Sequence, residues 1–129
     1  MKLDLKAGFN LLRIAARDEW KTVFTSRYGL YEYLVMPFGL SNAPSVFQRY
    51  VNNILKEKLD KGVNVYINDI MIHTETMEEH VLLVRWVLQK LMENNVCVNP
   101  KKCIFHIPEV EFCGYTVGQR GVKMGKDKV

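Results

Sequence analysis

The sequence predicts an α+β fold in which two amphipathic helices cover one face of an antiparallel sheet. Residues 41–59 and 76–95 carry apolar side chains at helical spacing, whereas several shorter segments show the alternation or β-branched enrichment of strands. With one inserted hairpin set aside, the order of these segments is β-α-β-β-α-β. This is the split βαβ, or ferredoxin-like, order, from which we infer the topology.

Composition indicates one globular domain over residues 1–129. Hydrophobic residues make up 48% of the 129 residues and charged residues 25%, which is enough apolar material for a core. No segment approaches a membrane span, and the N-terminus lacks a signal-peptide core. Three cysteines without CxxC spacing suggest reduced thiols rather than a disulfide framework or a zinc site. We therefore expect an intracellular protein that does not contact membranes.

The first two β-rich segments precede the first helix. "KLDL" at residues 2–5 alternates and predicts a strand close to the N-terminus. "KTVFTSRYGLYEYLVM" at residues 21–36 has two β-rich arms around Tyr28-Gly29 and predicts the inserted hairpin.

A second hairpin is predicted in "VNVYINDIMIH", residues 63–73, with two short strands meeting at Asn68-Asp69. In a ferredoxin-like sheet the first strand lies beside this hairpin, so we expect Asp4 and Asp69 to approach each other. By pattern alone, Asn-Asp is simply good turn chemistry, and an aspartate in a strand is most often solvent-facing.

The helices carry their own start and stop signals. Pro44 lies in the first turn of the first helix, and Gly62 follows it as a stop. In the second helix Thr76 and Glu79 form a capping-box pattern. The stripes expected to face the core are Val46, Phe47, Tyr50, Val51, Ile54, Leu55 and Leu59 in the first helix, and Met77, Val81, Val84, Leu88 and Leu91 in the second.

The C-terminal part is predicted to be β-rich. "NVCVN" at residues 95–99 and "VEFCGYTV" at residues 110–117 each predict a strand. "GQRG" at residues 118–121 predicts a turn into a last short strand at Val122–Met124.

Charge is distributed unevenly. The formal net charge is +4, from 18 Lys and Arg against 14 Asp and Glu, and the excess lies in the C-terminal part. From residue 101 onward the basic residues are Lys101, Lys102, Arg120, Lys123, Lys126 and Lys128, and the acidic ones are Glu109, Glu111 and Asp127. This segment permits contact with nucleic acid, although it can equally be a solvated face.

Several motifs in order resemble the reverse transcriptases of gypsy-type LTR retrotransposons. They are "KLDLKAGFN", "DEWKTVFTSRYGLYEYLVMPFGLSNAPSVFQ", "VYINDIMIHTETMEEHV" and "NPKKCIFHIPEVEFCGYTV". The resemblance covers essentially the whole chain, and "YLVMPFGLSNAPSVFQ" is its most specific part. It implies the palm fold of RNA-directed DNA polymerases, which are nucleotidyltransferases that use Mg²⁺ or Mn²⁺, a template–primer of RNA or DNA, and dNTPs.

The resemblance also implies the catalytic and metal-binding residues. Asp4 matches the first metal-binding aspartate of the family. "YIND" matches the Tyr-x-Asp-Asp box, so that Tyr66, Asn68 and Asp69 occupy its tyrosine, first aspartate and second aspartate. Asp4 and Asp69 are therefore the expected metal ligands, with Asn68 at a degenerate position.

The nucleotide-binding residues follow from the same resemblance. Phe9 matches the aromatic residue beneath the nucleotide sugar, Phe38 and Gly39 the segment against the incoming nucleotide and template, Gln48 the end of that motif, and Lys102 a lysine near the leaving phosphates. Taken alone, the two phenylalanines fit a core and the lysine fits surface charge.

The segment that holds the primer terminus is matched by "VEFCGYTV". The residues carried over are Phe112, Cys113, Gly114 and Tyr115.

Two departures from the family pattern predict weak chemistry. Nucleotidyl transfer requires stabilisation of charge on the phosphoryl oxygens, which two Mg²⁺ ions about 3.5–4 Å apart provide in such enzymes. Asn68 leaves Asp4 and Asp69 as the carboxylates of the site, so its formal charge falls from three negative to two. The N-terminal part of the fingers, the thumb, the connection and the ribonuclease H regions are also expected to be absent. We therefore expect weakened metal binding and severely reduced or absent activity.

Two functions remain open at this stage. One is a reverse transcriptase palm fragment that is inactive alone, and the other is a non-catalytic, domesticated module that binds nucleic acid or associates with itself. Palm surfaces without fingers and thumb expose apolar patches, so we expect a homodimer or larger oligomer. The sequence is equally compatible with a decayed element, a host-captured fragment and an engineered inactive variant.

Overall fold

The computed structural model describes residues 1–6 and 8–125. Lys126, Asp127 and Lys128, which belong to the charged C-terminal segment, lie outside the described residues.

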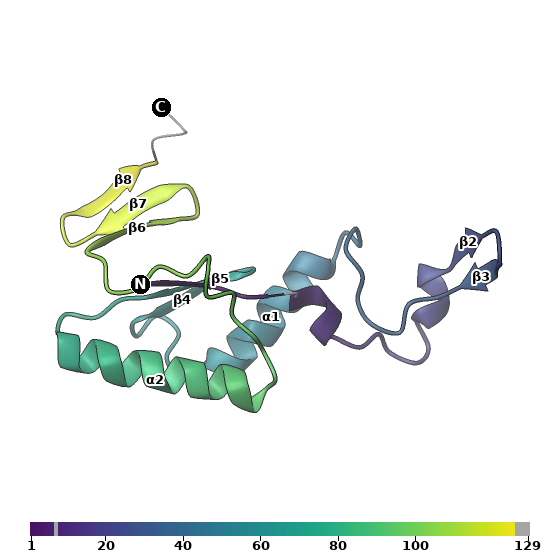
Figure 1. Ribbon diagram of the computed structural model, residues 1–129, viewed down its shortest axis with the longest axis horizontal. Coiled ribbons are helices and arrows are strands. Elements are labelled where there is room, and N and C mark those ends of the chain that lie inside the picture. Colours follow the sequence, from purple (N-terminus) through teal and green to yellow (C-terminus); the bar gives the residue numbers. More distant parts are fainter. Residues whose placement is uncertain (7, 126–129) are drawn as a thin grey trace.

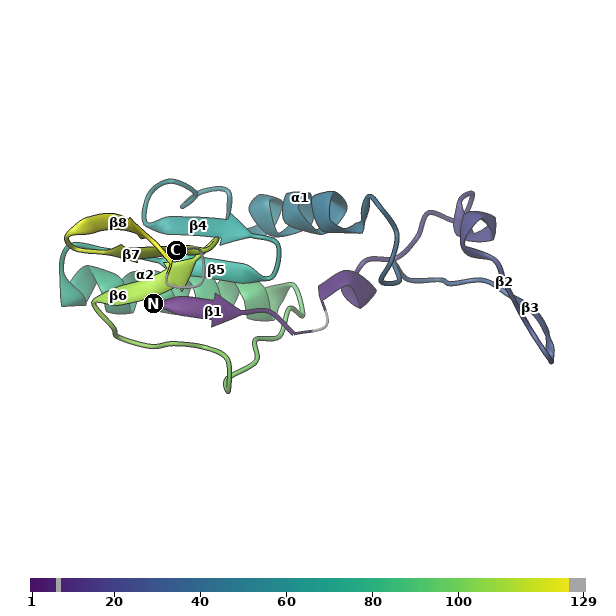
Figure 2. The same ribbon diagram turned by 90° about the horizontal axis from the view of Figure 1, so that it is seen from above.

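The central sheet has three antiparallel strands in the order β1-β5-β4. They are β1 (Lys2–Asp4), β4 (Val63–Tyr66) and β5 (Asp69–Ile72). β4 and β5 form a hairpin, and β1 pairs with the inner strand β5. The first strand and the second hairpin therefore lie side by side, as the ferredoxin-like order predicts (Figure 2).

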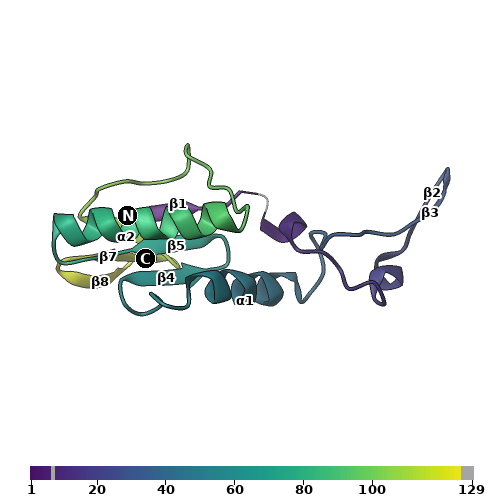
Figure 3. The ribbon, with the colours of Figure 1, turned by 90° about the horizontal axis from the view of Figure 1, so that it is seen from below.

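Two helices cover the same face of this sheet (Figure 3). α1 (Ala43–Leu55) packs on β4, and α2 (Met77–Glu93) packs on β5. The N-terminal signals act as predicted, because a proline lies in the first turn of α1 and the Thr76 hydroxyl accepts a hydrogen bond from Glu79 N at 3.3 Å. The predicted α+β fold is confirmed.

The face of α2 that enters the core differs from the predicted stripe. Of the predicted stripe, Leu91 is buried and Val84 packs partly buried against the core, whereas Met77, Val81 and Leu88 are exposed. Leu83 and Val87 are buried in addition. Both sets have helical spacing, so periodicity alone does not distinguish them. The largest side chains with almost no exposure are Leu3, Phe47, Val51, Leu55, Val63, Ile70, Ile72, Val87 and Leu91.

Residues 95–99 do not form the predicted strand. They follow the free edge of β1 through an isolated bridge between Leu5 and Val98 and a hydrogen bond from Lys6 N to Cys97 O at 2.8 Å. The chain then turns at Pro100, which has no N–H for a ladder, and pairing resumes between Lys2 and Ile104. The segment keeps the place of the fourth ferredoxin strand without its regular ladder.

A second antiparallel sheet contains β6 (Glu109–Phe112), β7 (Tyr115–Gly118) and β8 (Gly121–Met124). Residues 110–117, predicted as one strand, are instead a hairpin. Its two turn residues both have positive φ, 54° at Cys113 and 78° at Gly114, as a type I′ turn requires. This sheet lies on the side of the central sheet opposite α2 (Figure 1).

The inserted hairpin, β2 (Phe24–Ser26) with β3 (Gly29–Tyr31), forms an arm that extends away from the sheets and helices (Figure 1). Its turn is Arg27-Tyr28, one residue earlier than predicted, and the Ser26 hydroxyl accepts a hydrogen bond from Tyr28 N at 3.1 Å. Exposed aromatic side chains line the arm, which has little core of its own.

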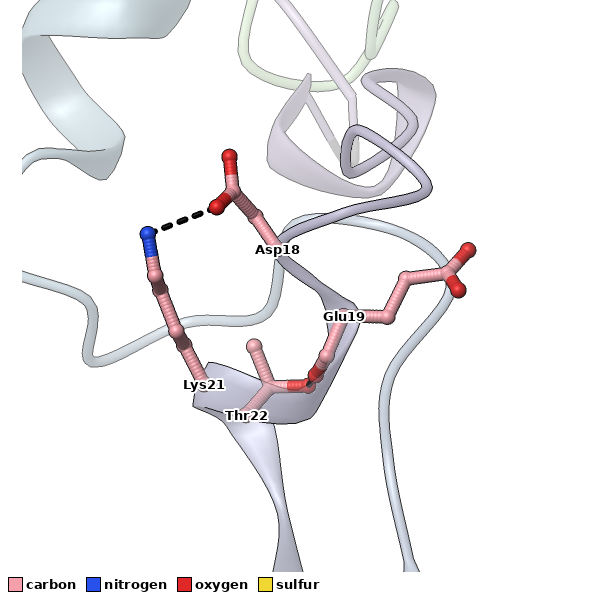
Figure 4. A network of polar contacts seen from close by, with 4 residues as sticks. All are labelled: Asp18, Glu19, Lys21 and Thr22. Carbon is pink, nitrogen blue, oxygen red and sulfur yellow. Dashed lines mark hydrogen bonds and ion pairs between the residues drawn. The ribbon is translucent and has the colours of Figure 1, made fainter.

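Two short 3₁₀ helices lead into this arm, η1 (Gly8–Leu11) and η2 (Glu19–Thr22). A 2.6 Å ion pair between Lys21 and Asp18 and a hydrogen bond from the Thr22 hydroxyl to Glu19 O at 2.7 Å stabilise η2 (Figure 4). Among the helices of the described residues, none is long and apolar enough to cross a membrane.

Gly8 is predicted to tolerate no side chain, because it lies against the ring of Phe47. A Cβ atom there would lie 2.7 and 2.8 Å from the two Cε atoms of that ring. We expect Gly8→Ala to lower the free energy of unfolding by about 1–3 kcal/mol through overpacking, measured by urea denaturation. Asn53→Ala, at an exposed position of α1, should change it by less than about 0.5 kcal/mol. Equal midpoints for the two variants would contradict this account.

Candidate metal and nucleotide site

Asp4 and Asp69 are direct cross-strand partners in the pairing of β1 with β5. Because side chains alternate along a strand, both carboxylates lie on the face opposite to Leu3 and Ile70, which are fully buried beneath the helices. Both aspartates are half-buried. The structure thus brings together two of the three positions expected to bind metal.

The third position lies in the hairpin turn. Tyr66 pairs with Asp69, so the turn residues are Ile67 and Asn68 rather than the predicted Asn68 and Asp69. Ile67 has a φ of 51°, a left-handed conformation that costs a residue with a Cβ atom roughly 1–2 kcal/mol. The box therefore places Asp69 on the strand and Asn68 on the turn.

The side-chain amide oxygen of Asn68 is not used in any hydrogen bond of the described residues. Its Oδ1 atom is buried and has no hydrogen-bond partner among the described residues. Its main-chain oxygen accepts a hydrogen bond from Leu5 N at 2.7 Å, which ties the turn to the end of β1. An unpartnered amide oxygen is chemically suited to a hard cation.

Lys2 is a charged neighbour that the sequence reasoning missed. Its Nζ atom lies 3.6 Å from Asp69 Oδ2, and both side chains are partly exposed. The signal was present, because Lys2 and Asp4 are two residues apart on one strand and therefore share a face. A cation at this site competes with an ammonium group that is already there.

The donor set fits one divalent ion better than two. Mg²⁺ retains several waters and commonly takes one or two protein carboxylates, which Asp4 and Asp69 supply. Over residues 1–6 and 8–125, no three His, Cys, Asp or Glu side chains are grouped so that they could hold one metal ion.

Gln48 is hydrogen-bonded to the outer edge of β4. Its Oε1 atom accepts a hydrogen bond from Ile67 N, and its Nε2 atom donates to Val65 O at 3.0 Å and to Asn52 Oδ1 at 2.9 Å. Both N–H groups of this amide are therefore used within the protein. Asn52, one helical turn after Gln48, is a second residue that the sequence reasoning missed.

The two aromatic residues expected at the nucleotide are placed differently. Phe9 is buried and meets Phe47 edge-on, with ring centroids 5.6 Å apart. Phe38 is exposed, and its centroid lies 4.9 Å from that of Phe9. Gly39 follows with a φ of 97°, which suits glycine. Phe38 therefore has the ring that is open for stacking, supported from behind by Phe9.

Lys102 lies in a turn joined to β1 near Asp4. Asn99 N donates to Asp4 O at 2.8 Å, Lys102 N donates to Asn99 O at 3.1 Å, and Asp4 N contacts Cys103 Sγ at 3.4 Å. The side chain of Lys102 is exposed. These bonds fix the backbone of the lysine turn relative to the first aspartate.

The expected primer-holding residues, Phe112 to Tyr115, form the turn of the β6–β7 hairpin. This hairpin belongs to the sheet on the open side of β1-β5-β4 (Figure 1). A cavity of about 550 Å³ has among its lining Met71 of the central sheet and Val110 and Val117 of the second sheet. The hairpin is thus on the side of the molecule that carries the aspartates.

Comparison with protein families and with known structures gives the relationship. Residues 1–117 match the family described as reverse transcriptase (RNA-dependent DNA polymerase). The Transposon Tf2-3 polyprotein of Schizosaccharomyces pombe is 45% identical over 120 residues, covering 93% of this chain and 9% of the polyprotein. The Tf2-7 polyprotein is 44% identical over the same shares.

Two solved structures share the fold closely. The foamy viral protease-reverse transcriptase in complex with RNA/DNA hybrid is 31% identical, with a TM-score of 0.86, over 98% of this chain and 17% of that one. A form of the same protein in complex with double-stranded DNA has a TM-score of 0.87 and is covered over 22% of its length. The chain therefore belongs to the reverse transcriptase family, and the resemblance to the enzymes of gypsy-type LTR retrotransposons is confirmed.

Proposed function

We propose that the chain is the palm region of a retrotransposon reverse transcriptase and that it has very little or no polymerase activity by itself. The observation that carries this proposal is the cross-strand pair Asp4–Asp69 beside an amide at position 68. The relatives belong to much longer proteins, of which this chain spans 9% in the Tf2-3 polyprotein. The rest of such a protein would contain the N-terminal part of the fingers, the thumb, the connection and ribonuclease H. We propose that this protein acts inside the cell.

Asp4 and Asp69 would hold Mg²⁺ or Mn²⁺, with Asn68 Oδ1 as an uncharged third donor. A bound divalent ion would supply the positive charge that phosphoryl transfer requires. Two carboxylates opposed by the ammonium group of Lys2 leave a net charge of about one negative at the site, so metal binding should be weak.

The substrates would be a template–primer and dNTPs. The foamy viral relatives were solved with RNA/DNA hybrid and double-stranded DNA. In this chain, the face of the central sheet opposite the helices carries residue types that suit contact with a nucleic acid. Phe38 would stack on a base or sugar with Gly39 allowing close approach, Lys102 would meet phosphates, and residues 112–115 would contact the primer end.

A second candidate is a non-catalytic module that associates with itself. Exposed apolar residues lie on α2 and on the arm, including Leu82, Met92 and Leu30, each at least 65% exposed. Such surfaces favour association, so we propose a homo-oligomer in solution. The basic residues near the C-terminus would allow this module to bind nucleic acid electrostatically.

Asn68→Asp is predicted to restore primer extension, because it returns a negative charge to the proposed metal site. We expect the unmodified chain to extend a DNA primer on an RNA template undetectably, and Asn68→Asp to gain measurable extension with Mg²⁺ or Mn²⁺. Extension by the unmodified chain that is lost on Asp4→Ala would overturn the proposed inactivity. Absence of extension by Asn68→Asp as well would refute the account in which the lost carboxylate alone limits the reaction.

Removing the competing ammonium is predicted to strengthen metal binding. We expect Lys2→Met to raise the Mn²⁺ affinity about two- to five-fold at low salt, because a partly exposed ion pair is worth about 0.2–1 kcal/mol. Mn²⁺-dependent broadening of the amide resonances of Asp4 and Asp69 measures it. Lys61→Met, at an exposed loop position, is the matched control and should leave the affinity unchanged; an equal gain would refute a local effect of Lys2.

Self-association is predicted to depend on a defined apolar surface. We expect light scattering at tens of micromolar to give a mass above that of one chain. Met92→Lys should lower this mass if the surface of α2 is buried in the oligomer, and Leu30→Lys should lower it if the arm is buried. Gln89→Lys adds the same charge to α2 without removing apolar area and should leave the mass unchanged. A sharp monomer peak for the unmodified chain would refute the oligomer.

A further inference from the structure

The side-chain carboxamide of Gln48 makes hydrogen bonds to the main chain on both sides of Tyr66, at the outer edge of β4. Ile67 N, one residue after Tyr66, donates to Oε1, and Nε2 donates to Val65 O, one residue before Tyr66. In a parallel ladder, a residue of the neighbouring strand makes this same pair of bonds around the residue opposite to it. Gln48 thus replaces one residue of a further strand on a sheet whose last described strand is β4.

The orientation of this carboxamide is fixed by chemistry. The acceptor must face the N–H of Ile67, and the two donors must face Val65 O and Asn52 Oδ1. A flipped amide would place donor against donor and acceptor against acceptor. Asn52, which is also on α1, therefore locks Gln48, and α1 is attached to the hairpin at the point where its turn begins.

This contact acts on a residue in a strained conformation. Ile67 is β-branched and has a φ of 51°, which such residues rarely adopt. In that conformation its N–H points out of the hairpin toward α1, where Gln48 accepts it. The main-chain oxygen of the next residue, Asn68, accepts a hydrogen bond from Leu5 N at 2.7 Å. A shift of the turn would therefore also move the end of β1.

We infer that Gln48 is a positioning residue, which holds Ile67 in the left-handed conformation and thereby keeps Asp69 opposite Asp4. It acts through the turn, and its used N–H groups assign it this role in place of a nucleotide contact. The part of the inference that concerns metal rests on the proposed function, whereas the part that concerns the turn does not.

The test is a cycle of Gln48→Leu and Ile67→Gly. Leucine keeps the size of residue 48 and removes its hydrogen bonds, and glycine takes positive φ without help. Amide hydrogen exchange at Leu5 is the main readout, because Leu5 donates to Asn68 O and does not bond to Gln48. We expect Gln48→Leu to speed this exchange at least ten-fold, and the double variant to return it to within about three-fold of the unmodified chain.

Metal affinity gives a second readout in a chain that also carries Asn68→Asp. We expect Gln48→Leu to weaken Mn²⁺ binding about three- to ten-fold, and added Ile67→Gly to recover most of the loss. Gln89→Leu is the matched control, since Gln89 also bonds a residue four positions later, Glu93, at 3.2 Å; it should change neither readout.

The outcomes separate the two proposals. Unchanged exchange at Leu5 in Gln48→Leu, or equal loss in the single and double variants, would overturn the positioning role. Should Gln48→Leu not fold, Gln48→Met, which keeps the length of the side chain and removes its hydrogen bonds, must still speed the Leu5 exchange, or the inference is refuted. If the Asn68→Asp chain binds no Mn²⁺, the proposed metal site is wrong, and the exchange data alone decide the role of Gln48.

Discussion

The antiparallel register of β1 against β5 is the constraint on which the rest of the structure depends. It places Asp4 opposite Asp69 and, on the other face, turns Leu3 and Ile70 into the core. A slip of one residue would exchange the two faces, burying a carboxylate and exposing leucine. The buried residues beneath the helices therefore determine where the acidic pair lies, although their side chains are on the other face of the sheet.

That register also creates an electrostatic difficulty. Two half-buried carboxylates on adjacent strands repel each other unless a cation lies near them. Lys2 relieves part of this repulsion from within the protein, 3.6 Å from Asp69. An amide at position 68 avoids adding a third negative charge. Lys2 and the amide at position 68 therefore both reduce the negative charge that the fold must accommodate on this face.

Local signals were easier to predict than tertiary ones. The order of the two helices and the three strands of the central sheet, the Thr76 cap and the approach of Asp4 to Asp69 followed from sequence, because they depend on short-range chemistry and on one topology. The turns of the β2–β3 and β4–β5 hairpins were each placed one residue late, and at the observed positions the side chains of Ser26 and Gln48 accept hydrogen bonds from turn N–H groups. The buried face of α2 was predicted only in part, because tertiary packing selects between two overlapping apolar stripes. The roles of the site residues remain predictions, because the spacing of residues in a sequence does not show which ligand they bind.

In the segment Tyr66 to Asp69, main-chain atoms determine the geometry of the turn, whereas the side chain at position 68 determines its charge. Main-chain groups of Val65, Ile67 and Asn68 hold the turn through Gln48 and Leu5, and none of these bonds uses the side chain at position 68. Asparagine and aspartate are nearly the same shape, so the backbone framework is compatible with either. Charge can therefore be lost at this position while the turn, the register and the fold are retained. The shape of the turn therefore does not report the charge at position 68.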